Sequence, residues 1–138
     1  MSNELLVGID PGVRTGFAVW NRVAKRFAVV ATVGFPAALS QIVAMHNEGA
    51  LREVIFEDAR KRSWFGSRSI EALQGAGSIK RDCSLWEEFL TFHAIPFLAV
   101  SPQQKGAKLS TAQFARMTGW RGLTSEHSRD AGMLVFGR

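Results

Sequence analysis

The chain has 138 residues, of which 46% are hydrophobic, and its 17 Lys and Arg outnumber 12 Asp and Glu to give a formal net charge of +5. This length predicts one domain, residues 1–138, with its own core, and the composition excludes an intrinsically disordered chain. No apolar run reaches the roughly 20 residues of a membrane span, and the single cysteine, Cys83, excludes an internal disulfide and a cysteine-based zinc site, so a cytoplasmic setting is expected.

The first half of the sequence predicts a three-stranded meander, a helix and a further strand. Residues 4–10 form an apolar run that ends at Asp-Pro-Gly, which is typical of a buried strand followed by a turn. Residues 15–20 and 26–33 are rich in β-branched and aromatic residues, and a short polar link joins them, so an antiparallel meander is predicted. Pro36 indicates the start of a helix over 36–47, and residues 52–57 predict a fourth strand.

The second half predicts one long helix, a strand and two short helices. Residues 60–67 are charged and irregular, which is typical of a loop. A helix is predicted over 68–93, with glycines at 75 and 77 that permit a kink. A strand over 96–100 and helices over 110–118 and 125–136 complete the chain, with Ser110 and either Thr124 or Ser125 as N-caps. This order predicts an α/β domain with helices packed on a mixed sheet, without selecting one such fold.

Carboxylates end two of the predicted strands and a third lies in the last helix. Asp10 ends the first strand, although an Asp before Pro-Gly also serves simply to begin a turn. Glu57 ends the fourth strand and is equally compatible with a solvent-facing edge position. His127 and Asp130 share one helical face, which the apolar residues after them turn toward the core. The competing interpretation, an acid favoured by the helix dipole, suits Glu126 better than Asp130.

These four side chains are a donor set for hard divalent cations. Carboxylate oxygens favour Mg²⁺ or Mn²⁺, and two such ions about 4 Å apart stabilise the attacking and leaving oxygens of phosphodiester cleavage. The spacing of Asp10, Glu57 and Asp130 in the sequence does not by itself bring them together.

Two groups of cations predict contacts to a polyanion such as DNA. The first surrounds two aromatic residues, Trp64 and Phe65, and the second follows the fifth strand; their members are Arg60, Lys61, Arg62 and Arg68, and Lys105 and Lys108. Two aromatic rings in so charged a loop are predicted to stack on unpaired bases as a wedge. The alternative is that one of the rings anchors the loop to the core.

Five segments in order resemble the motifs of RuvC-type Holliday junction resolvases, members of the ribonuclease H-like superfamily, and especially the compact resolvases that phages encode. The segments are VGIDPGVRTGFAVW, VIFEDAR, QGAGSIKRD, SPQQKGAK and SEHSRDAGML. They cover nearly the whole chain. The resemblance implies a five-stranded ribonuclease H-like sheet and a Mg²⁺-dependent crossover junction endonuclease, also supported by Mn²⁺, that acts in DNA recombination and repair.

The resemblance also implies roles for individual residues. Asp10, Glu57 and Asp130 would be metal ligands, and His127 would take a position that is Asp in some members and His in others. Either Lys105 or Lys108 would be the basic residue near the scissile phosphate.

A homodimer is predicted because a four-way junction is two-fold symmetric and two of its strands must be cut. The helix over 68–93 carries more apolar surface than one sheet face needs, at Leu73, Leu85, Trp86 and Phe89. Part of it is therefore expected at the interface, unless all four side chains are core.

Three other interpretations fit parts of the pattern. A different ribonuclease H-fold nuclease, acting on flaps or RNA–DNA hybrids, would use the same metal site. A non-catalytic DNA-binding module gains nothing from anions next to phosphates, so the acidic positions argue against it. A sugar-kinase-like fold shares the first turn but needs two domains.

Overall fold

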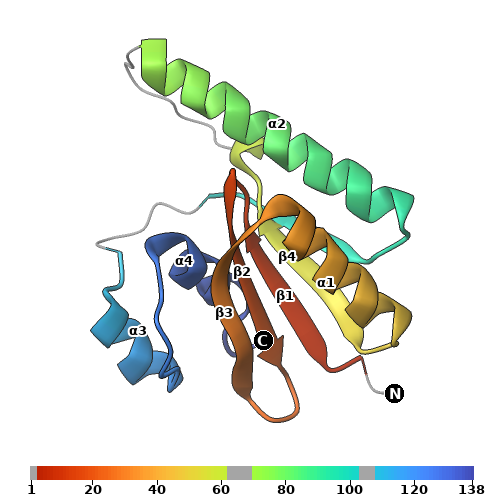
Figure 1. Ribbon diagram of the computed structural model, residues 1–138, viewed down its shortest axis with the longest axis vertical. Coiled ribbons are helices and arrows are strands. Elements are labelled where there is room, and N and C mark those ends of the chain that lie inside the picture. The colour runs from red at the N-terminus through yellow and green to blue at the C-terminus, as the bar shows by residue number, and fades with distance from the viewer. Residues whose placement is uncertain (1–2, 62–69, 103–107) are drawn as a thin grey trace.

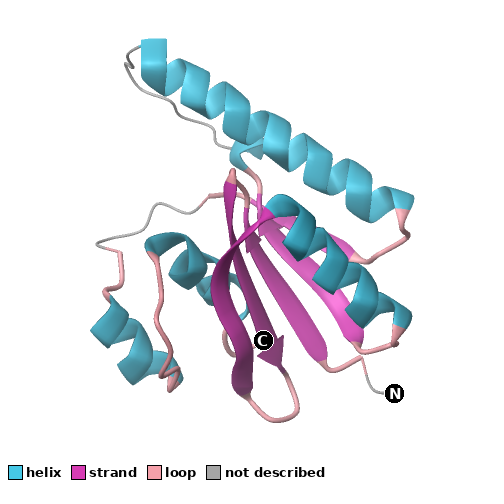
Figure 2. Cartoon of the chain, in the orientation of Figure 1, coloured by secondary structure: helices cyan, strands magenta, loops and turns pink. Residues whose placement is uncertain are grey.

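The computed structural model describes residues 3–61, 70–102 and 108–138, with 70–76 described by their backbone (Figure 1). Five strands form one mixed sheet in the order β3-β2-β1-β4-β5 (Figure 2). The antiparallel meander consists of β1 (Leu5–Asp10), β2 (Arg14–Asn21) and β3 (Arg26–Gly34). β4 (Leu51–Glu57) pairs in parallel with β1, and β5 (Phe97–Val100) pairs in parallel with β4. The predicted α/β sheet of a meander plus two parallel strands is confirmed.

Helices cover both faces of this sheet. α1 (Phe35–Asn47) and α2 (Ile70–Phe92) lie over one face, and α4 (Glu126–Val135) lies over the other, near α3 (Thr111–Thr118) (Figure 1). Within the described residues no helix has the length and apolar character needed to cross a membrane.

Strand alternation divides the core between the two faces. Side chains of β1 alternate, so that Val7 and Ile9 pack toward α1 and α2 while Leu6 packs toward α4. The larger cluster contains Trp86 and Leu90 of α2, both with no exposed surface. Burying such side chains stabilises the fold by about 1.5–3 kcal/mol each, before entropy is subtracted.

The structure refines three of the predictions. α2 is one continuous helix that passes through both of its glycines, so the kink that they permit is not used. A short 3₁₀-helix, η1 (Ala59–Lys61), occupies the start of the predicted loop. The N-cap of α4 is Ser125, whose hydroxyl accepts a hydrogen bond from the backbone N–H of Ser128 in a capping box, and Ser110 caps α3 in the same manner.

The topology brings two carboxylates to one edge of the sheet. Because β1 and β4 are parallel, both end at the same edge, and Ile9 lies opposite Phe56 in their register. The next residue on each strand is an acid, Asp10 on β1 and Glu57 on β4. The edge therefore carries a pair of carboxylates on neighbouring strands.

Candidate active site

The first contact at this edge joins β1 to α4. The imidazole Nδ1 of His127 lies 3.0 Å from Oδ2 of Asp10, across 117 residues of sequence. Ser125, the N-cap of α4, contacts the hydroxyl of Thr32 on β3, which fixes the start of the helix over the meander. His127 occupies the first turn of α4, so these contacts place it over the end of β1.

Two strand glycines allow α4 to lie this close. A Cβ at Gly16 would stand 2.1 Å from the carbonyl oxygen of His127, and a Cβ at Gly8 would stand 2.2 Å from that of Ala131. Real Cβ atoms do not approach backbone oxygens so closely, so any side chain at either position would push the helix away. The glycines of the first motif thus set the distance between the helix and Asp10.

Asp10 lies among negative charges in a largely buried position, since its side chain is 16% exposed. Burial raises the pKa of Asp10 from its ordinary 3.8 to about 6; the hydrogen bond with His127 opposes this, and the charges of Glu57 and Asp130 raise the pKa further. The other three predicted side chains therefore all act electrostatically on Asp10. A cation among them would relieve the repulsion.

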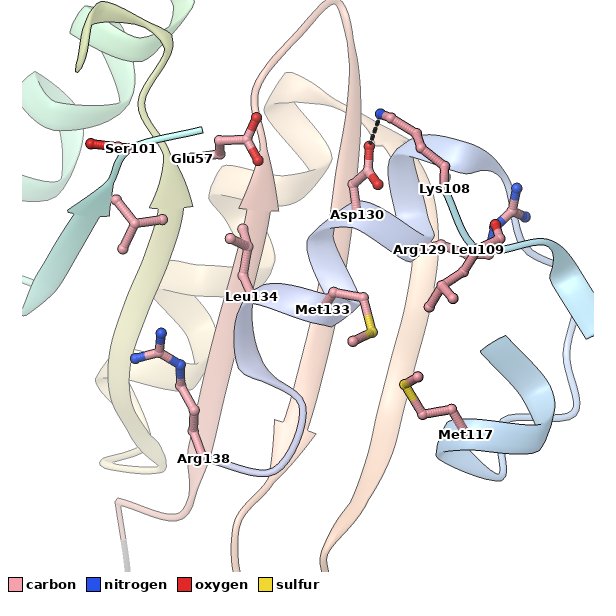
Figure 3. Close-up of a pocket in the computed structure, with 11 residues that line it drawn as sticks. Glu57, Ser101, Lys108, Leu109, Met117, Arg129, Asp130, Met133, Leu134 and Arg138 are labelled. Atoms are coloured by element: carbon pink, nitrogen blue, oxygen red, sulfur yellow. Dashed lines mark hydrogen bonds and ion pairs between the residues drawn. The ribbon is translucent and has the colours of Figure 1, made fainter. Parts of the chain in front are cut away.

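Glu57 and Asp130 share one cavity of about 370 Å³ (Figure 3). Glu57 stands at the end of β4, and Asp130 projects from α4 toward the same end (Figure 3). The wall also contains Lys108 and Arg129. The site is thus open to a ligand on the α4 face of the sheet.

Lys108 forms ion pairs with both carboxylates of α4. Its Nζ lies 2.7 Å from Oδ2 of Asp130 and 2.9 Å from Oε1 of Glu126. The hydrogen bond to Asp130 raises the pKa of Lys108 above its ordinary value, so the side chain stays protonated. Arg129 holds the neighbouring segment, because its guanidinium donates to the carbonyl oxygen of Leu109 at 2.9 Å.

An ion pair directly follows Glu57 in the chain. Asp58 is 1% exposed and accepts hydrogen bonds from Nε and Nη2 of Arg60, each at 2.8 Å. These bonds lower the pKa of Asp58 below its ordinary value. Arg60 also reaches Glu87 of α2 at 3.3 Å. The pair therefore ties the end of β4 to α2.

Two further contacts fix the same strand end. The ammonium of Lys61 donates to the carbonyl oxygen of Ala99 on β5 at 2.7 Å. Burial raises the pKa of the Cys83 thiol to about 11, and this neutral thiol lies 3.6 Å from the carbonyl oxygen of Glu57. Arg60 and Lys61, two of the predicted DNA contacts, thus both bond within the chain.

The donor types fit a divalent cation, and the side-chain positions need adjustment. Among the described residues no group of three or more His, Cys, Asp and Glu is arranged to hold a metal ion. Asp10 is turned to His127 and Asp130 to Lys108. Rotation of these side chains toward the space between β1, β4 and α4 would be needed to form a metal centre.

The sequence did not predict the residues that support the site, and part of the predicted site lies outside the described residues. Asp58 and Arg129 lie within the segments VIFEDAR and SEHSRDAGML, but nothing in those segments predicts the ion pair of Asp58 with Arg60 or the hydrogen bond of Arg129 to Leu109. Glycines at alternate strand positions, by contrast, are a readable signal of close approach. The remaining predicted site residues lie outside the described ranges; they are Arg62, Trp64, Phe65, Arg68 and Lys105.

No protein-family model and no curated protein sequence matches the chain. A solved structure does, "T. thermophilus RuvC in complex with Holliday junction substrate", with a TM-score of 0.55 and 18% sequence identity. The match covers 94% of this chain and 88% of that one. The chain therefore has the ribonuclease H-like fold of RuvC.

Proposed function

We propose that this protein is a single-domain, divalent-metal-dependent endonuclease that hydrolyses phosphodiester bonds in branched DNA such as four-way junctions. One observation carries the proposal: Asp10, Glu57, His127 and Asp130 gather at one sheet edge, close enough that Glu57 and Asp130 raise the pKa of Asp10. The similarity to a junction-bound RuvC suggests the substrate class.

The acidic residues have a function in this proposal that they lack in a plain DNA-binding module. Uncompensated carboxylates repel the phosphates of DNA, so a binding surface would exclude them. Asp10, Glu57, Asp130 and His127 would hold Mg²⁺, or Mn²⁺, which the imidazole accepts more readily. When bound, such ions supply the positive charge that stabilises the attacking and leaving oxygens.

The chain's own groups would orient the substrate around that centre. Before a metal ion binds, His127 holds the Asp10 carboxylate through their hydrogen bond. Lys108 offers a protonated ammonium beside Asp130, and either it or Lys105 would hold the scissile phosphate.

Further contacts to the junction belong to the proposal. Arg60, Lys61, Arg62 and Arg68 would act on flanking phosphates, and Trp64 or Phe65 would stack on a base at the crossover. We further propose that the protein acts as a homodimer in the cytoplasm and takes part in DNA recombination and repair.

The deciding experiment offers labelled four-way junctions, flaps, RNA–DNA hybrids and linear duplex to the protein with Mg²⁺ and with chelator. We expect cleavage to depend on the metal and to be fastest on the four-way junction. Asp10→Asn, Glu57→Gln and Asp130→Asn should each reduce the rate by about 100-fold or more, with junction affinity largely kept, because affinity rests on cations at phosphates. Glu48→Gln, which changes an exposed acid after α1, is the matched control. Equal cleavage by these variants and the wild type would refute the proposal.

A further inference from the structure

The cavity beside the carboxylates extends well beyond them. Glu57 and Asp130 lie at one end, and Met117 and Arg138 lie at the other (Figure 3). Between the two ends Met133 and Leu134 of α4 form part of the wall (Figure 3). The cavity thus has a charged end, at the proposed catalytic centre, and a largely apolar body that no catalytic role explains.

The apolar body lies where the end of β5 meets α4. Val100 of β5 lines the cavity and packs against the smaller core cluster, which contains Ala131 and Val135 of α4. Ala99, the preceding residue of β5, packs on the opposite face of the sheet against the larger core cluster. The apolar wall is therefore on the α4 side of the sheet.

The composition of the wall fits a flat, weakly polar ligand that is joined to an anion. Its apolar members are Val100, Leu109, Met117, Met133 and Leu134. Methionine thioethers pack well against aromatic edges and adapt to their shape. Three cations, Lys108, Arg129 and Arg138, accompany the two carboxylates, so the wall attracts a polyanion once the carboxylates are neutralised.

We propose that this cavity receives one unstacked nucleobase of the strand being cut, adjacent to the scissile phosphate. The inference rests on the proposed function, because it takes the phosphate to lie at Glu57 and Asp130. A nucleotide joins a phosphate to a planar base through one sugar, and the apolar wall belongs to the same cavity as Glu57 and Asp130. The volume of about 370 Å³ lies in the usual range of small-ligand sites.

This site would make the protein selective for branched DNA. Seating a base requires removing it from the stack, which costs least where pairing is already interrupted, as at a junction centre. The wall then favours one base over another by shape, which gives cleavage a dependence on the nucleotide at that position.

The test combines abasic substrates with a variant that narrows the cavity. After the wild-type cut is mapped, junctions with an abasic site on the 5′ or the 3′ side of it are compared with the intact junction. One of the two should be cut about tenfold more slowly, as expected for a lost base-stacking contact. Met117→Trp, at a side chain that is 50% exposed, should slow the intact junction similarly and remove its advantage over the abasic one. Leu123→Trp, at a side chain that is 95% exposed and outside the wall, is the control and should behave as the wild type.

A second readout does not require cleavage. A fluorescent base analogue at the sensitive position, bound to the non-cutting Asp10→Asn variant, should change its emission, and Met117→Trp in the same background should abolish the change. Equal cleavage of abasic and intact junctions, with no change in emission, overturns the inference. A shift in sedimentation caused by Met117→Trp, without loss of base discrimination, would assign the cavity to a second copy and also overturn it. If the wild type cuts no junction, the analogue is moved through the crossover positions instead: a change in emission that Met117→Trp abolishes sustains the base site while the proposed function fails, and no change at any position overturns the inference.

Discussion

At the scale of single residues, ionisation of Asp10 lowers the free energy of unfolding. Its pKa of about 6 lies above the ordinary 3.8, so the folded protein holds a proton more tightly than the unfolded chain. The free energy of unfolding therefore falls as pH rises from about 4 to about 6 and stays reduced above that. A site that binds a cation gains from this arrangement, because the cation offsets the cost.

Removing the charge should therefore stabilise the metal-free protein. With chelator present, Asp10→Asn is expected to raise the free energy of unfolding by about 1–3 kcal/mol at pH 7.5 and by little at pH 4, since one pKa unit corresponds to about 1.4 kcal/mol. Denaturant titrations at the two pH values measure this. Mg²⁺ should stabilise the wild type alone, and increasingly so above about pH 6. A variant less stable than the wild type at pH 7.5 would contradict this account of the site.

In the proposed metal centre, Lys108 would compete with a metal ion for Asp130. Its ammonium lies 2.7 Å from the carboxylate and neutralises it in the absence of other cations. Lys108→Ala should thus bind Mn²⁺ several-fold more tightly without DNA, by calorimetry, and still cut junctions more slowly. Arg116→Ala, an exposed cation of α3, is the control. If Lys108→Ala binds Mn²⁺ no better than the wild type does, Lys108 does not compete at Asp130.

At the scale of elements, the end of β4 is held by the ion pair of Asp58 and Arg60 rather than by strand pairing alone. Breaking a buried pair leaves a charge uncompensated, which costs more than the pair contributes. The pKa of Asp58 is lowered, so its stabilising effect is present above the ordinary pKa and is lost as pH falls through the lowered one.

Arg60→Ala should therefore lower the free energy of unfolding by about 2–4 kcal/mol. The side chain of Arg60 is 28% exposed, so the lower half of that range is expected. Arg52→Ala, which removes an exposed arginine of β4, should change the free energy of unfolding little. The double change Asp58→Leu with Arg60→Met should recover much of the loss. An Arg60→Ala variant as stable as the wild type would show that the ion pair does not hold the end of β4.

The elements were largely predictable because hydrophobic periodicity and breaker residues are local. Leu5–Asp10, Arg26–Gly34 and Leu51–Glu57 follow from short apolar runs, and Ser110 follows from capping. What joins distant segments was not predictable from spacing alone. The contact of Asp10 with His127 depends on how α4 lies across the sheet, and the family resemblance rather than periodicity brought those residues together.

At the scale of the whole molecule, the surface over α1 and α2 exposes large apolar side chains. On the α1 and α2 side Trp86 is fully buried in its own chain, so it is excluded from the predicted dimer interface. Leu85 remains 45% exposed and Phe92 82% exposed on the same helix. Both line a groove between the helices. Residues of both α1 and α2 line this groove; they are Phe35, Leu39, Leu85, Glu88, Phe89 and Phe92.

Such a surface suits self-association, because a two-fold axis across α2 would pair each exposed aromatic with apolar surface of the second copy. A dimer would place two carboxylate edges on one assembly, so both strands of a junction could be cut within one encounter.

Phe92→Glu should therefore yield a folded monomer in sedimentation at micromolar concentration, since the side chain is too exposed to support the core. On a plasmid carrying an extruded cruciform this variant should produce mainly nicked circles where the wild type produces linear DNA. Leu123→Glu, 95% exposed before α4, should keep the wild-type mass and products. A wild type that stays monomeric on the junction and still yields linear plasmid would exclude the dimer and leave each strand to be cut by an independent copy.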